Sequence, residues 1–173
     1  MKNTLLHHFF NMLIIEQDYF ECHEIMEDAW KNKSFYSKQD KEVFLILVAT
    51  AEYHYRRGNK TGAYRSLQKA LNIYQKTPFN LNDLGLKQNF LELINNRLTL
   101  IHVEPFTPMN YPITDEVFEA LFHESNFDDK ESFKSYLASH KVIDENLIHR
   151  HKLRDRTEVI NERLRALNRK KRD

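Results

Sequence analysis

The central segment of the sequence, residues 43–51, constrains the fold most strongly, because it reads Val-Phe-Leu-Ile-Leu-Val-Ala-Thr-Ala. Apolar side chains lie on every side of such a segment, so other parts of the structure must surround it. A buried strand would end within this run, but Glu52 to Arg57 extend the pattern beyond the usual length of a strand. The segment therefore predicts a central helix over about residues 41–57.

A second helix is expected directly after the central one, over about residues 59–75. Gly58 supplies the left-handed end of the first helix, and Asn59 is a preferred N-cap for the next. The apolar residues that share one face of this second helix are Ala63, Leu67, Ala70, Leu71 and Tyr74. The two helices are therefore predicted to form an antiparallel hairpin.

Two further helices complete the predicted core, one over about residues 4–30 with a break near Asp18, and one over about 83–102 capped by Asp83. The whole chain contains three glycines, which disfavours a β fold rich in turns. The sequence therefore predicts an all-α fold, a bundle of four core helices with a smaller C-terminal helical extension.

Three prolines, Pro105, Pro108 and Pro112, follow the fourth helix and predict an extended, irregular segment. We therefore expect a helical bundle over residues 1–104, a proline-rich linker over 105–113 and a helical extension over 114–173. The helices expected in the extension, with their capping residues, are 114–125 (Thr114), 129–140 (Asp128 or Asp129) and 144–170 (Asp144).

Composition restricts the class of protein further. The net charge is +1, so the chain as a whole has no charge that would select nucleic acid or a membrane surface. The single cysteine, Cys22, excludes an intramolecular disulfide. We identify no signal peptide and no run of about 18 apolar residues that would form an integral membrane segment, so we expect a cytoplasmic protein.

The segment from Tyr19 to Trp30 contains the residues best suited to chemistry. On a helical wheel, His23 and Glu27 fall in the same quadrant as Tyr19 and Trp30, and this aromatic face is expected to point inward. The acids expected on the opposite face are Glu21, Glu24 and Asp28.

Two segments of the chain resemble the domain-of-unknown-function 309 family. Its first signature is similar to residues 19–30, an aromatic residue followed by His23-Glu24, Glu27 and Trp30. Its second is similar to residues 53–63, where His54 precedes Arg57-Gly58-Asn59 and Gly62-Ala63. The resemblance covers roughly residues 11–101. It implies an all-helical bundle and no assigned activity, and it departs from the pattern at Cys22, where a small residue such as Ala is expected.

Three interpretations of these residues remain open. His23, Glu27 and His54 would form a divalent metal site if the two helices bring them together. The same residues would otherwise form a buried hydrogen-bond network, or a ligand pocket lined by Tyr19, His23, Trp30 and His54. Cys22 is not expected to act with His23 as a nucleophile, since adjacent helical side chains diverge by about 100°. Arg57 and Asn59 at a helix N-terminus are a possible anion site.

The C-terminal arm is basic and amphipathic, and it ends Arg169-Lys170-Lys171-Arg172. Such a helix binds a protein partner, nucleic acid or an anionic surface, or it docks on its own domain with a solvated basic face. We first expect a non-enzymatic interaction or regulatory protein that binds a protein or nucleic acid through residues 144–173. The alternatives are a metal-dependent enzyme, such as a hydrolase with Glu24 as base, and a small-molecule binding bundle.

Overall fold

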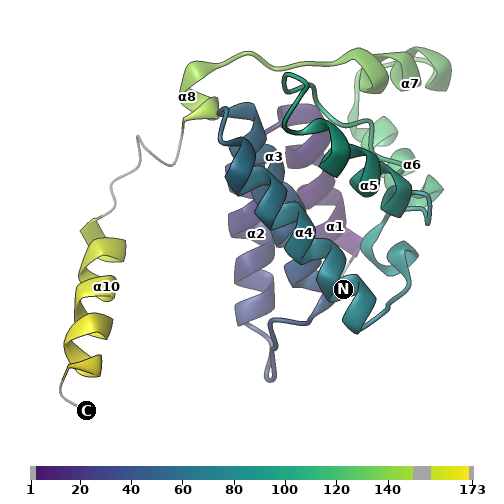
Figure 1. Ribbon diagram of the computed structural model, residues 1–173. Helices are drawn as coiled ribbons and strands as arrows, with labels where there is room; N and C mark the ends of the chain where they lie inside the picture. The colour runs from purple at the N-terminus through teal and green to yellow at the C-terminus, as the bar shows by residue number, and fades with distance from the viewer. Residues whose placement is uncertain (1–2, 150–156, 172–173) are drawn as a thin grey trace.

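The computed structural model describes residues 3–149 and 157–171 of the chain (Figure 1). Within these ranges all the regular elements are helices, and β-type pairing is limited to one antiparallel bridge between Leu86 and Ile113. The predicted all-α class is therefore confirmed. No helix in the described ranges has the length and apolar character required to cross a membrane.

The expected first helix consists of three elements: α1 (Asn3–Phe10), the π-helical turn η1 (Asn11–Glu16) and α2 (Tyr19–Lys31). The chain changes direction at Gln17, whose φ of 51° lies in the left-handed region that non-glycine residues seldom adopt. Asp18 then caps α2, because its carboxylate accepts a hydrogen bond from the Glu21 N–H at 3.0 Å. The predicted break near Asp18 is confirmed.

The predicted hairpin is formed by α3 (Lys41–Arg56) and α4 (Lys60–Lys76). Gly58 has a φ of 82°, and the Asn59 side chain accepts a hydrogen bond from the Gly62 N–H at 3.0 Å. Helix α3 packs between α2 and α4 (Figure 1). The central position expected for the apolar segment is therefore confirmed.

The fourth predicted helix is wrong in its first part. The structure contains a short 3₁₀ helix, η2 (Leu81–Leu84), followed by α5 (Phe90–Leu100), so Asp83 lies inside η2 and does not cap a long helix. Gly85 interrupts the segment with a φ of 74°, and a Cβ there would lie 2.8 Å from side-chain atoms of both Phe10 and Val117. The left-handed conformation of Gly85, which packs closely against Phe10 of α1 and against Val117, therefore interrupts the predicted helix.

Between α5 and the next helix, the chain is extended and is tied to the segment around Gly85. The Lys87 N–H donates to the Pro112 carbonyl at 2.7 Å, and the Thr114 N–H donates to the Gly85 carbonyl at 2.9 Å. The irregular, helix-free path expected for residues 105–113 is observed, and backbone hydrogen bonds hold its end in place.

The extension contains α6 (Asp115–Glu124), α7 (Lys130–Ser139), α8 (Glu145–Ile148) and α10 (Thr157–Lys170). The side chains of Thr114, Asp129 and Asp144 accept hydrogen bonds at the N-termini of α6, α7 and α8, as predicted. The helix expected over 144–170 is not continuous, because α8 ends at Ile148. Residues 150–156 of that predicted helix lie outside the described residues.

One hydrophobic core extends across the proline-containing segment. Its buried members include Phe10 of α1, Phe44 of α3 and Phe90 of α5, together with Tyr111 from the extended segment and Phe133 of α7. The division into bundle, linker and extension stays a prediction, because it concerns whether each part folds independently. The parts share one hydrophobic core in the folded chain.

Candidate functional site

Three side chains of the first signature lie together on α2. The Nδ1 atom of His23 lies 3.2 Å from a carboxylate oxygen of Glu24, and its Nε2 atom lies 3.5 Å from one of Glu27. The second oxygen of Glu27 lies 2.8 Å from the Lys31 ammonium group. One ligand atom from each of His23, Glu24 and Glu27 can be chosen so that all three lie within 4.8 Å of one another.

These three residues lie at the edge of the core and not within it. Their side chains are 29%, 33% and 28% exposed for His23, Glu24 and Glu27 respectively. The face of α2 that is fully buried carries Tyr19, Cys22 and Met26. His23 and Glu27 were expected to point inward, but they lie beside the buried face of α2 and remain partly exposed.

His54 lies apart from this group. Its Nδ1 atom is 3.3 Å from the amide nitrogen of Asn59, the residue that caps α4. Burial, and secondly the positive charge of Arg57, lower the pKa of His54 below its usual value. Tyr53 occupies the place expected for His54 beside α2, since its ring centroid lies 5.9 Å from that of Phe20.

Trp30 and Arg57 have structural contacts of their own. The Trp30 indole N–H donates to the Ser37 carbonyl at 3.0 Å and to an Asp40 carboxylate oxygen at 3.2 Å, which fixes the loop after α2. The Arg57 guanidinium group lies 5.0 Å from the centroid of the Tyr53 ring. The Trp30 indole therefore bonds to the loop after α2 and not to His23, Glu27 or His54.

Tyr19 is fully buried and lies in a polar cluster that sequence reasoning missed. The Arg56 guanidinium group lies 4.2 Å from the Tyr19 ring centroid, and Arg56 donates to the Gln17 carbonyl at 2.6 Å. Burial, and secondly the nearby Glu52 carboxylate, raise the pKa of the Tyr19 hydroxyl. Arg56 therefore stabilises the left-handed turn that separates η1 from α2.

The centre of this cluster is an ion pair between α3 and α5. Arg97 donates from Nε and Nη2 to the two carboxylate oxygens of Glu52, at 3.0 and 2.6 Å. The Glu52 and Arg97 side chains are only 1% and 12% exposed. Burial raises the pKa of Glu52, although Arg97 acts in the opposite direction. A carboxylate next to a strongly apolar helical segment requires such a partner once it is buried, and this was the signal available in the sequence.

Arg97 also connects the bundle to the extended segment. Its Nη2 atom donates to the Thr107 carbonyl at 2.8 Å, and its guanidinium group lies 4.8 Å from the Tyr55 ring centroid. The Tyr55 hydroxyl donates to the Glu104 carbonyl at 2.7 Å. These contacts are structural in type, because they satisfy buried polar groups across two elements.

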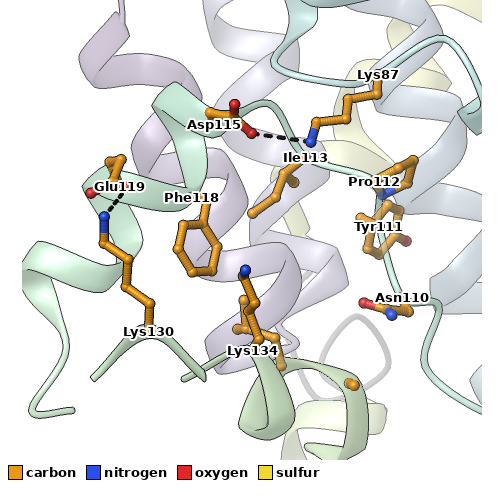
Figure 2. Close-up of a pocket in the computed structure, with 12 residues that line it drawn as sticks. Lys87, Asn110, Tyr111, Pro112, Ile113, Asp115, Phe118, Glu119, Lys130 and Lys134 are labelled. Carbon is orange, nitrogen blue, oxygen red and sulfur yellow. Dashed lines mark hydrogen bonds and ion pairs between the residues drawn. The ribbon is translucent and has the colours of Figure 1, made fainter. Parts of the chain in front are cut away.

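A separate cavity of about 710 Å³ lies between the end of the extended segment, α6 and α7 (Figure 2). Lys87 pairs with Asp115 at 3.1 Å, and Lys130 pairs with Glu119. Figure 2 shows the Lys134 amine directed toward the open centre near Phe118. Lys134 pairs with Glu131 at 3.4 Å, so all three lysines of this cavity are paired with carboxylates and little charge is available for a ligand.

The comparisons with known proteins agree with the two signatures. The family model described as "Domain of unknown function (DUF309)" matches residues 6–66, which include both signature segments. The uncharacterized protein YpuF of Bacillus subtilis (strain 168) is 35% identical over 157 residues, which cover 90% of this chain and 88% of YpuF. No solved structure matches. The chain therefore belongs to the domain-of-unknown-function 309 family.

Proposed function

We propose that this chain is a cytoplasmic, non-enzymatic interaction protein that binds an acidic partner protein through α10. The observation that carries the proposal is an apolar stripe on α10 that is open to solvent. Ile160, Leu164 and Leu167 are 52%, 53% and 56% exposed. Their spacing places them on one face of the helix, and α10 is drawn apart from the bundle in Figure 1.

The residues beside the stripe favour an acidic partner over a second copy of the chain. At about 100° per residue, Arg163 and Lys170 border the stripe on one side, and Asn161 and Asn168 border it on the other. Two such helices packed antiparallel along their stripes, with Ile160 opposite Leu167, would bring the Arg163 side chains of the two copies close together. A partner with carboxylates along an apolar face would instead pair with both cations.

The same stripe favours a protein over a nucleic acid. A nucleic acid would neutralise the basic side chains but would leave Ile160, Leu164 and Leu167 in water. A partner helix or groove would bury them, and burial of a leucine or isoleucine side chain contributes about 1.5–3 kcal/mol. The exposure of the stripe also weighs against docking of this helix on its own domain.

The test is proximity cross-linking in the native cells, followed by quantitative mass spectrometry, with Leu164→Gln/Leu167→Gln as the variant. Arg165→Gln/Arg169→Gln is the matched control, because it alters the opposite face of the same helix. We expect the control to keep an acidic partner and the stripe variant to lose it. Equal recovery of every partner by a chain that lacks residues 157–173 would contradict the proposal.

A second candidate function is divalent metal binding by His23, Glu24 and Glu27. It is supported by the 4.8 Å limit within which one ligand atom from each residue lies, and imidazole with carboxylates suits zinc or manganese. Three protein ligands would leave a position open for water, so a metal-dependent hydrolase remains the enzymatic form of this candidate.

Metal binding is tested by titration of the untagged protein with Zn²⁺ and Mn²⁺ in a calorimeter. His23→Ala and Glu27→Gln should each abolish stoichiometric binding. His54→Ala is the matched control and should bind as the wild type does, because His54 lies with Asn59 at the turn between α3 and α4. Binding that survives His23→Ala would remove this candidate.

A further inference from the structure

A groove of about 450 Å³ lies beside Trp30, where the end of α2 meets α3 and α4. The apolar residues that line it are Trp30, Val43, Leu47 and Ile73. Val43 and Leu47 are four residues apart on α3, so their side chains share one face of that helix. The groove is therefore built on two adjacent helices of the bundle core and on an indole that two hydrogen bonds hold in place.

Three lysines also line this groove: Lys38, Lys69 and Lys76. Among the described residues, no carboxylate lies within ion-pair distance of any of the three ammonium groups. No acid lines the groove either. Lys69 and Lys76 are seven residues apart on α4, two helical turns, so both lie on the face that contributes Ile73.

The cavity between α6 and α7 also contains lysines, but its lysines are paired with carboxylates. There Lys87 and Lys130 pair with Asp115 and Glu119, which also line that cavity. In the groove beside Trp30 the positive charge is not compensated. An apolar surface with uncompensated positive charge is complementary to a ligand that has an apolar body and an anionic group.

We propose that this groove, which we call the lysine groove, binds a small anionic amphiphile, a carboxylate or phosphate attached to an acyl or aromatic body. Its volume lies within the range of about 300–1,000 Å³ that small-molecule sites occupy. A stable protein interface needs roughly 20–30 residues on each partner, more than the nine that line this groove, which favours a small molecule here. The proposal is independent of the function assigned to α10.

Trp30 makes the test specific, because it is the only tryptophan in the chain and it lines the lysine groove. Octanoate is titrated into the full-length protein while Trp30 emission is recorded, and octanol is the uncharged comparison. We expect a saturable change with octanoate, with a dissociation constant lower than that of octanol. Octanol that binds as tightly as octanoate, or no saturable change with octanoate, would overturn the proposal.

The charge requirement is tested with Lys69→Glu/Lys76→Glu, which should weaken octanoate at least about tenfold and leave octanol unchanged. Lys130→Glu/Lys134→Glu makes the same change of net charge at the other cavity and should leave octanoate binding as in the wild type. Lys69→Gln/Lys76→Gln removes charge without reversing it, and an intermediate loss is expected if both variants keep the wild-type helical circular dichroism. Equal octanoate affinity in the wild type and the Gln variant would overturn the proposal.

Discussion

Two clusters of charged side chains in this protein differ in their burial and therefore in their effect on stability. Glu52 and Arg97 form a two-point ion pair in the core, whereas His23, Glu24 and Glu27 meet at the partly exposed edge of α2. A buried charge that loses its partner remains out of water at a high cost, while an exposed charge is solvated when its partner is removed. The family signature contains the partly exposed cluster, and we expect the fold to depend more strongly on the buried pair.

The largest effect that separates the two clusters is expected from Arg97→Ala. This substitution leaves the Glu52 carboxylate buried without its partner and should lower the free energy of unfolding by about 3–5 kcal/mol at neutral pH. Urea denaturation measures the loss. The matched control is Arg65→Ala on the exposed side of α4, which should change stability by less than about 0.5 kcal/mol. Similar losses in the two variants would show that the buried pair does not support the fold.

The second prediction concerns pH. Burial raises the pKa of Glu52 above its ordinary value, so the folded protein binds this proton at a higher pH than the unfolded chain. Relative to Glu52→Gln, the wild type should therefore gain stability as the pH falls through the raised pKa. The gain should be complete below the ordinary pKa of about 4.3, and it amounts to about 1.4 kcal/mol for each unit of pKa difference. Urea denaturation between pH 4 and 8 measures this difference. A wild type that loses stability relative to the variant on acidification would reverse the assigned direction.

A third prediction places a partly buried network between the two extremes. Lys33 contacts Asp40 at 3.0 Å and the largely buried Glu42 at 3.2 Å. Lys33→Ala should lower the free energy of unfolding by about 1 kcal/mol. Lys38→Ala, in the same loop, is the matched control and should have no measurable effect. If both variants retain full stability, the contribution of an ion pair to stability would not increase with its burial in this protein.

The smallest effect is expected at the family signature itself. His23→Ala should change the free energy of unfolding by less than about 0.5 kcal/mol in a metal-free buffer, because exposed ion pairs contribute little. His123→Ala on α6 is the control for loss of an exposed histidine. A loss above about 2 kcal/mol would mean that His23 is required for the fold and that its signature has a structural explanation.

The sequence predicted a helix correctly where its pattern was compatible with only one type of secondary structure. The apolar run of residues 43–51, extended by residues 52–57, predicted a central helix, and Gly58-Asn59 predicted the turn that separates it from the next helix. The long helix expected from residue 83 was wrong because Gly85 adopts a left-handed conformation against Phe10 and Val117. Those contacts come from distant parts of the chain, and no local pattern reports them.

The candidate site divides in the same way. The four-residue spacing of His23 and Glu27 predicts that they lie close together, and they do. Glu24 was expected on the opposite face of the helix, but its carboxylate reaches His23. The addition of His54 depended on how α2 and α3 pack against each other, and packing placed Tyr53 there instead. The Glu52–Arg97 pair joins residues that are distant in the chain, so its partner could not be identified by periodicity.

The sequence by itself determined the all-helical class, the central hairpin and the membership of the family, because these depend on local propensity, on periodicity and on motif spacing. Only the tertiary structure decided which polar residues are buried, which helix faces meet and which lysines lack a partner. These properties arise from contacts between segments far apart in the chain, and each depends on rotations of helices about their axes. A helical turn places side chains about 100° apart, so a small rotation is enough to move a residue such as His23 from the core to its edge.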